Sequence, residues 1–176
     1  SSEVNYAVGA TYTKDQSATL YAVWSEVVAT TTIGEETVTY ESVQEAITAA
    51  GTNSGATVTL IKDNIEENVT VAAGQNIVLD LNGKTLNGNN ENTITNYGTL
   101  TITGETGTIT GAGNVILNYG TLNKTGNCSI TGTGADKSTI LNNGTCEISA
   151  GTVSSENYNA VYNQLGGKLT ISGGNI

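Results

Sequence analysis

The chain has no proline, histidine, arginine, methionine or phenylalanine, and it has only two cysteines. Without proline, every residue keeps the backbone N–H that pairing between strands requires. Without histidine, the chain lacks the commonest general base and a common zinc ligand. Two cysteines, Cys128 and Cys146, are too few for a disulfide framework. Both stand at apolar positions of the repeat described below, and we interpret them as small buried thiols.

Positive charge is scarce, since six lysines stand against sixteen acidic residues and the formal net charge is −10. Phosphate binding needs clustered lysine or arginine, so this balance argues against nucleic acid as a partner. The same reasoning argues against anionic membrane surfaces. No apolar run is long enough to predict insertion into a membrane. No signal peptide is visible either, but Ser1 reads as a cut within a longer protein, so this does not argue against secretion.

The pattern apolar-x-Asn-x-Gly-Thr-apolar occurs three times, beginning at Ile94, Ile116 and Ile140. The asparagines of these copies are 22 and then 24 residues apart, and a looser copy begins at Val161. Repetition at this period is typical of a solenoid, in which one unit cannot bury its apolar face without its neighbours.

Apolar residues that alternate with polar ones, the pattern of half-buried strands, extend the repeat towards both ends of the chain. They align as three columns, one for each short strand in a turn of about 22 residues. The sequence therefore predicts an all-β fold, a parallel β-helix of five turns and a partial sixth, on the order of 25 Å long. The first column is Val58/Leu60, Leu79/Leu81, Leu100/Ile102, Leu122, Cys146/Ile148 and Leu169/Ile171, the second is Ile65, Leu86, Ile109, Ile130, Val153 and Ile176, and the third is Val71, Ile94, Ile116, Ile140 and Val161.

One corner of each turn carries an asparagine that is followed two residues later by glycine in the clearest copies. Asparagine and glycine tolerate left-handed backbone conformations, so we expect such conformations at this corner. The asparagine amides of successive turns are expected to hydrogen-bond one another. The predicted ladder consists of Asn96, Asn118, Asn142 and Asn163.

Residues 37–50 depart from the repeat. A short strand is predicted over residues 37–39. Ser42 and Glu45 then have the spacing of a capping box, which predicts a helix over residues 43–50. We expect this helix to cover the open apolar end of the first turn, as the capping units of repeat proteins do.

Three segments follow from this pattern. Residues 1–24 are predicted to be part of a separate small β module, residues 25–36 a polar linker, and residues 37–176 the β-helix with its cap. The sequence stops at Ile176, part-way through a turn. A cut solenoid exposes unpaired strand edges, so we expect end-to-end or edge-mediated homodimers of this polypeptide.

Two segments resemble known modules. Residues 12–24, Tyr-Thr-Lys-Asp-Gln-Ser-Ala-Thr-Leu-Tyr-Ala-Val-Trp, resemble the closing strand of the internalin-type B-repeat (Listeria–Bacteroides repeat) of bacterial surface proteins. Residues 36–176 resemble the pectate-lyase-like, right-handed parallel β-helix modules of gut bacterial surface proteins. This second resemblance rests on Tyr40–Ile47, Val58–Asp63, Leu79–Leu86 and the Asn-x-Gly-Thr-Leu repeats.

The resemblance implies a right-handed coil and an extracellular location, secreted or attached to the cell wall of a Gram-positive bacterium. It does not imply an activity, because such modules often carry no known catalytic residues. Polysaccharide lyases of this fold usually rely on a basic residue, often arginine, together with acidic calcium ligands. This chain has no arginine and no visible acidic cluster.

Tyr97 and Tyr119 occupy equivalent positions one turn apart, and Asn143 is next in line. Exposed aromatic rings can stack on sugars, so these three residues are candidates for ligand binding. A tyrosine stack with a purely structural role is the alternative.

Asp80 is the most notable of the four aspartates, because it should point outward from a strand. We expect it to form a surface ion pair with Lys62 or Lys84 rather than to act in catalysis. We predict no catalytic residue, no metal site and no cofactor.

The sequence therefore predicts a non-enzymatic cell-surface β-helix that serves as an adhesin or stalk. Its expected partners are host or dietary glycans, or a host surface protein. The alternative is a carbohydrate-active β-helix enzyme, a polysaccharide lyase or glycosidase, whose catalytic residues lie outside this chain or have diverged.

Overall fold

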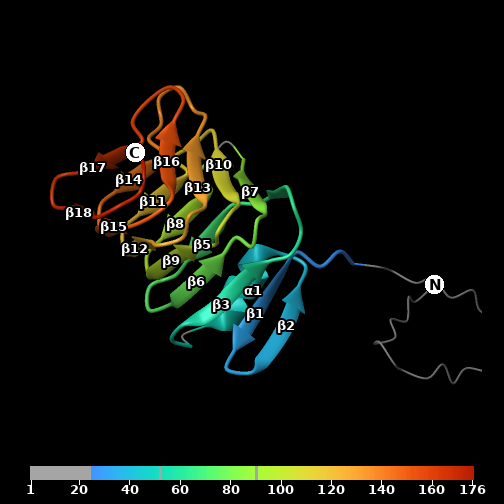
Figure 1. Cartoon of the computed structure of the whole chain (residues 1–176). Helices are drawn as coiled ribbons and strands as arrows, with labels where there is room; N and C mark the ends of the chain where they lie inside the picture. The colour runs from blue at the N-terminus through green and yellow to red at the C-terminus, as the bar shows by residue number, and fades with distance from the viewer. Residues whose placement is uncertain (1–24, 52, 90) are drawn as a thin grey trace, which may run out of the picture.

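The chain coils into a parallel β-helix in which three short strands make one turn (Figure 1). The computed structural model describes residues 25–51, 53–89 and 91–176, so the module predicted over residues 1–24 lies outside the described residues. Each turn contributes one strand to sheet A, then one to sheet B and one to sheet C, and pairs in parallel with the turns before and after it. The fold class predicted from the repeat is confirmed.

Sheet A has eight strands, and sheets B and C have five each. Sheet A contains β1 (Ala29–Ile33), β2 (Glu36–Tyr40), β3 (Ala56–Leu60), β6 (Asn76–Asp80), β9 (Thr99–Thr103), β12 (Thr121–Lys124), β15 (Thr145–Ile148) and β18 (Lys168–Ile171). Sheet B contains β4 (Ile65–Glu66), β7 (Thr85–Gly88), β10 (Thr108–Gly111), β13 (Ser129–Gly132) and β16 (Thr152–Ser155). Sheet C contains β5 (Val69–Val71), β8 (Ile94–Asn96), β11 (Ile116–Asn118), β14 (Ile140–Asn142) and β17 (Val161–Asn163).

The apolar columns face the interior, as predicted, but their register differs from the sequence alignment at two places. Leu79 pairs with Ile102, whereas the alignment joined it to Leu100. The same slip affects the start of the third column, where Val69 takes the place that we gave to Val71. Side chains of a strand alternate between two faces, so a slip of two residues leaves the same set facing inward. The periodicity of apolar residues therefore cannot detect a two-residue slip in register.

The asparagine corner contains a continuous ladder of hydrogen bonds. The Nδ2 atom of Asn96 donates to Oδ1 of Asn118 over 2.7 Å, and Asn118 donates in the same way to Asn142 over 2.7 Å. Asn142 then donates to Asn163 over 2.6 Å. The side-chain amides of the first three asparagines are fully buried and also donate to backbone carbonyl oxygens. The ladder thus links four successive turns, and only its last member, Asn163, is exposed to water.

Replacing Asn118 with alanine should destabilise the fold by about 1–3 kcal/mol, because its partners on both sides would lose buried hydrogen bonds. Asn123 provides the matched control, since it points outward from sheet A. Asn123→Ala should cost less than about 0.5 kcal/mol. Chemical denaturation of both variants measures the difference, and equal losses of stability would contradict a structural role for the ladder.

The glycines of this corner are required for close approach between turns, and not for a left-handed backbone as we expected. Among the described residues, the non-glycine residues with positive φ are Asn64 and Asn82, which lie elsewhere. A Cβ atom on Gly120 would overlap the carbonyl oxygen of Gly98, and one on Gly144 would overlap that of Gly120. The turns stack so closely here that no side chain fits between them.

The prediction of a linker over residues 25–36 is wrong. β1 pairs antiparallel with both β2 and β3, so the hairpin extends sheet A beyond the first turn. Thr31 is buried, and its Oγ1 donates to the carbonyl oxygen of Ala46 over 2.8 Å. We inferred a linker from the polarity of this threonine-rich run. Threonine is nevertheless β-branched and fits strands well, so polarity was not evidence against a strand.

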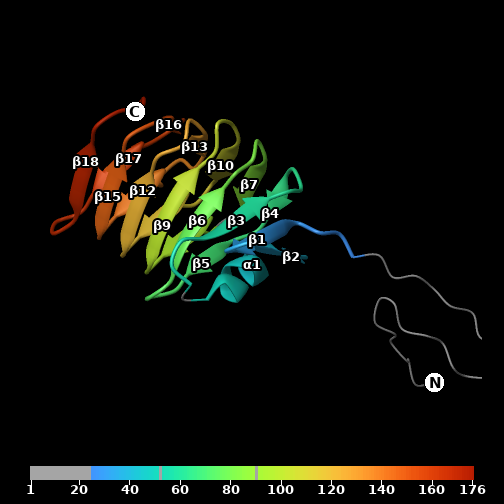
Figure 2. The same ribbon diagram turned by 60° about the horizontal axis from the view of Figure 1, so that its bottom comes forward.

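The helix α1 (Val43–Ala50) covers the N-terminal end of the coil beside β1 and β5 (Figure 2), as predicted. Ser42 Oγ accepts the N–H of Glu45 over 3.0 Å, which is one half of the predicted capping box. Glu67 completes the cap in a way that we did not predict, because its carboxylate accepts the N–H groups of Val43 and Gln44 over 2.8 Å each. A carboxylate at this end also opposes the positive end of the helix dipole.

Lys124 is the charged side chain that lies fully buried among the described residues. It occupies the inward position that Ile102 and Ile148 occupy in the neighbouring turns. Its Nζ atom donates to the carbonyl oxygens of Gly126 and Ala150, the latter over 3.2 Å. Backbone oxygens at the corner between sheets A and B thus replace water around the ammonium group. Without such partners, burial of this group would cost much free energy.

Cys128 and Cys146 are buried free thiols, as predicted. Burial raises the pKa of Cys146 to about 12. Burial also raises the pKa of Cys128, although the positive charge of Lys124 acts in the opposite direction. Because the thiolate is the reactive form, both cysteines should be inert at neutral pH.

Among the residues that the structure describes, no helix covers the C-terminal end of the coil as α1 covers the N-terminal end. The last strands of sheets A and C, β18 and β17, have a strand neighbour on one side only, whereas the outer edge of β16 is partly paired through the bridge between Thr152 and Asn175. Ile171 and Ile176 are 50% and 51% exposed. Unpaired strand edges beside apolar side chains favour pairing with another chain.

We therefore expect the 176-residue polypeptide to dimerise through this end at high micromolar concentration, which analytical ultracentrifugation would detect. A strict monomer whose amides over residues 167–176 are protected from hydrogen exchange would contradict this expectation.

Candidate functional site

Sheet C and the corner that follows it present two columns of outward side chains. In the motif apolar-x-Asn-x-Gly, the apolar residue and asparagine point inward, so the two x residues point outward. Backbone hydrogen bonds such as Tyr119 N–H to Asn96 O continue the pairing of turns beyond the strands. We call the following residues the sheet C face: Thr95, Leu117, Leu141 and Tyr162 in the first column, and Tyr97, Tyr119, Asn143 and Gln164 in the second.

Tyr97 and Tyr119 stack on each other, with ring centroids 5.2 Å apart and planes inclined by 3°. They are nevertheless 50% and 49% exposed. Each ring covers one face of the other, and Asn143 follows Tyr119 in the column. Ala72 precedes Tyr97 in the column, and both Ala72 and Asn143 are shorter than tyrosine, so the outer face of each ring is only partly covered. The structure thus brings the three predicted binding residues into one column.

The sequence analysis missed the first column. Leu117 and Leu141 are partly exposed, and Tyr162 is 49% exposed. On sheets A and B the outward positions carry mainly hydroxyl, amide or charged side chains. The signal was present in the repeat, because these residues stand between the inward apolar residue and the inward asparagine of each copy. Alternation from the inward apolar residue already places them outward.

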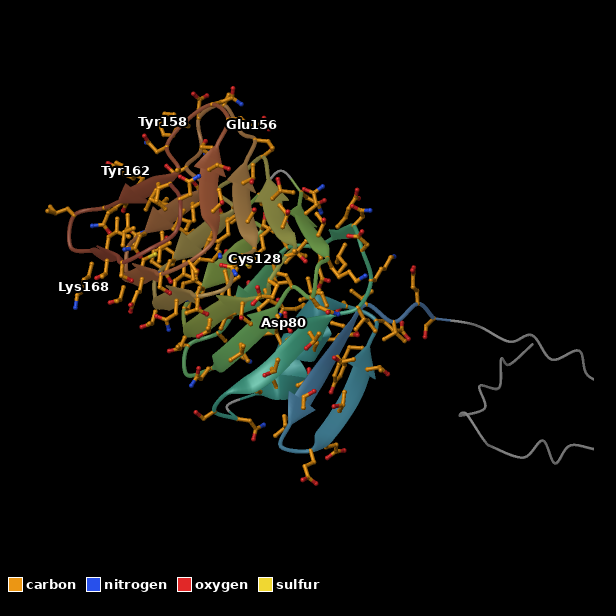
Figure 3. All side chains as sticks on the ribbon, viewed as in Figure 1. Asp80, Cys128, Glu156, Tyr158, Tyr162 and Lys168 are labelled. Atoms are coloured by element: carbon orange, nitrogen blue, oxygen red, sulfur yellow. The ribbon has the colours of Figure 1, made fainter. Side chains whose placement is uncertain are left out.

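The sheet C face carries no charged residue, although the chain has a net charge of −10. Asp80, the acidic residue considered above for catalysis, lies on a different part of the molecule from Tyr162 of this face (Figure 3). The face is therefore aromatic and aliphatic, with amide groups beside it.

Asp80 does not form the ion pair that we predicted. Lys62 pairs instead with Glu26, with Nζ and Oε2 2.6 Å apart. Asp80 Oδ1 accepts the N–H of Asn82 over 2.9 Å, within the tight turn after β6. Asp80 and Glu105 line an open polar cleft of about 410 Å³ at the corner between sheets A and B. The hydrogen bond from the Asn82 N–H thus gives the Asp80 carboxylate a partner without a lysine.

Within residues 25–51, 53–89 and 91–176, no three acidic or cysteine side chains gather to hold a metal ion. In the same part of the chain no helix is long and apolar enough to cross a membrane. No protein-family model, curated protein or solved structure matches the chain.

Proposed function

We propose that this chain is a non-enzymatic β-helix of a cell-surface protein, which serves as a stalk or adhesin and contacts glycans through the sheet C face. The observation that carries this proposal is the exposed Tyr97–Tyr119 pair on an uncharged face. Large apolar side chains exposed together usually mark a binding site.

The chemistry of the face suits a sugar. The apolar face of a sugar ring packs against an aromatic ring, and the partly open outer face of Tyr119 is available for this contact. The amides of Asn143 and Gln164 can donate to and accept from sugar hydroxyls. A host surface protein that presents similar groups is the other partner that we consider.

The extracellular location rests on the resemblance of residues 12–24 and 36–176 to bacterial surface modules. The same resemblance supports a right-handed β-helix of the pectate-lyase-like type. A rigid coil between a membrane or wall anchor and a ligand is a suitable stalk, because each turn adds a strand spacing of about 4.8 Å to its length.

A glycan array tests the proposal. We expect the chain to bind a defined subset of glycans, and Tyr119→Ala to abolish that binding because it removes that ring face. Tyr158→Ala is the matched control, since Tyr158 is 56% exposed but lies outside the sheet C face. Binding that survives Tyr119→Ala, or no binding at all, would contradict the proposal.

A carbohydrate-active enzyme is the second candidate, and the cleft that holds Asp80 and Glu105 is the observation in its favour. Two carboxylates can act as acid and base on a glycosidic bond. Release of unsaturated sugars from polygalacturonate, or of reducing sugars from another polysaccharide, would support this candidate if Asp80→Ala abolished it. We expect no such release.

A further inference from the structure

We infer that the sheet C face takes an extended, uncharged polysaccharide that runs along the solenoid axis, with successive sugar residues in step with successive turns. This inference rests on the proposed function and adds the class and direction of the ligand.

The direction follows from the first column of the face. Leu117, Leu141 and Tyr162 come from three successive strands that pair in register, so they form a stripe parallel to the axis. The stripe repeats with the strand spacing of about 4.8 Å. One sugar residue of a flat, equatorially linked chain has nearly this length, so each residue of such a chain can lie over one turn.

The linkage follows from the shape of the stripe. A β-1,4-linked glucose chain is a straight ribbon whose axial C–H groups form apolar surfaces, which can pack on aliphatic and aromatic side chains. An α-1,4-linked chain curves into a helix, so after a few sugar residues it no longer follows a straight stripe. The straight stripe therefore favours the ribbon.

The second column supplies the polar contacts. Asn143 and Gln164 lie beside Leu141 and Tyr162, two residues further along the same turns. Their amides lie beside the edge of a ribbon on the stripe, where its equatorial hydroxyls project. A hydroxyl that loses water on binding can thus regain a hydrogen bond.

The charge of the chain restricts the ligand further. A polysaccharide of uronic acids would carry negative charge to a protein whose net charge is −10 and would meet no lysine or arginine on the sheet C face. Long-range repulsion slows such an encounter. A neutral polysaccharide has no such cost.

The size of the face argues against a second copy of this chain as its occupant. A stable protein–protein interface usually involves about 20–30 residues on each side. The sheet C face has eight residues on four turns. A single polysaccharide chain of four or so sugar residues matches that footprint.

Calorimetric titration of the whole chain with oligosaccharides tests the inference. Cellohexaose should bind roughly tenfold or more tightly than cellobiose, because it can contact every turn of the stripe. Maltohexaose, which has the same composition but α linkages, should bind no more tightly than cellobiose. Equal affinities for cellobiose and cellohexaose would overturn the inference.

Variants locate the site. Leu141→Asp should weaken cellohexaose binding roughly tenfold, whereas Thr131→Asp, the same charge placed outward on sheet B, should leave it unchanged. Leu141→Thr guards against misfolding, because Thr95 already occupies this column, and it should weaken binding several-fold. Unchanged binding in both Leu141 variants would overturn the inference.

The glycan array separates this inference from the proposed function. An array with no bound glycan contradicts both. Bound glycans that depend on Tyr119, without dependence on chain length or on Leu141, contradict the axial polysaccharide alone.

Discussion

Gly120→Ala is expected to cost about 3 kcal/mol of stability, because the new methyl group would overlap backbone atoms. Its Cβ would meet the carbonyl oxygen of Gly98 and the backbone of Tyr97 in the preceding turn. Neither can move aside as a flexible side chain could. The turns would have to separate, and the hydrogen bonds of the neighbouring asparagine ladder would lengthen with them.

The control is Gly34→Ala in the loop between β1 and β2. Gly34 has a φ of 63°, but a Cβ added there meets nothing within 4 Å. This variant should lose only about 1–2 kcal/mol, the cost of a left-handed conformation in an L-residue. Urea denaturation of both variants gives the comparison. If Gly120→Ala is no less stable than Gly34→Ala, then close approach is not the reason for glycine in the repeat.

The second large effect is expected at Lys124. Lys124→Ala should cost about 2–5 kcal/mol, since it opens a cavity and leaves one buried and one partly buried carbonyl oxygen without their donor. Lys124→Met keeps most of the volume and removes only the donor, so it should cost about 1–3 kcal/mol. The difference between the two variants measures the cavity alone.

Thermal and chemical denaturation of both Lys124 variants provides the measurement. Replacing a buried charge by an apolar side chain of similar size is sometimes neutral or stabilising. A methionine variant as stable as the natural chain would therefore show that the bonds to Gly126 and Ala150 make no net contribution. Equal losses in the two variants would show that no cavity forms.

The repeat predicted the coil because burial at the strand positions depends on alternation, and alternation is visible in a single sequence. Every strand from β6 to β18 lies over or beside an apolar column, and α1 lies where Ser42 and Glu45 placed it. What alternation could not show is the pairing partner. For Leu79, alternation predicted the correct side of the sheet but the wrong partner in the next strand. For β1, which is made largely of threonine, alternation favoured neither side and did not indicate the neighbouring strands.

The candidate site was less accessible to sequence reasoning than the fold. Tyr97 and Tyr119 were found because aromatic residues stand out in a repeat. Leu117 and Leu141 were missed because leucine in a β-helix is expected to point inward, although alternation from the inward Ile116 and Ile140 already places both outward. Lys124 was missed for the converse reason, since a lysine is expected to reach solvent and only backbone oxygens in the corner allow it to stay inside.

The stacking of turns also determines how the molecule would respond to mechanical tension. The hydrogen bonds of the sheets and of the asparagine ladder join each turn only to those before and after it. A pull on the C-terminal strand therefore detaches the last turn first, because that turn is held from one side only, whereas α1 and the β1–β2 hairpin cover the opposite end. Each turn that peels away releases about 22 residues, or about 75 Å of extended chain. A solenoid built in this way lengthens in nearly equal steps under tension and keeps its remaining turns folded.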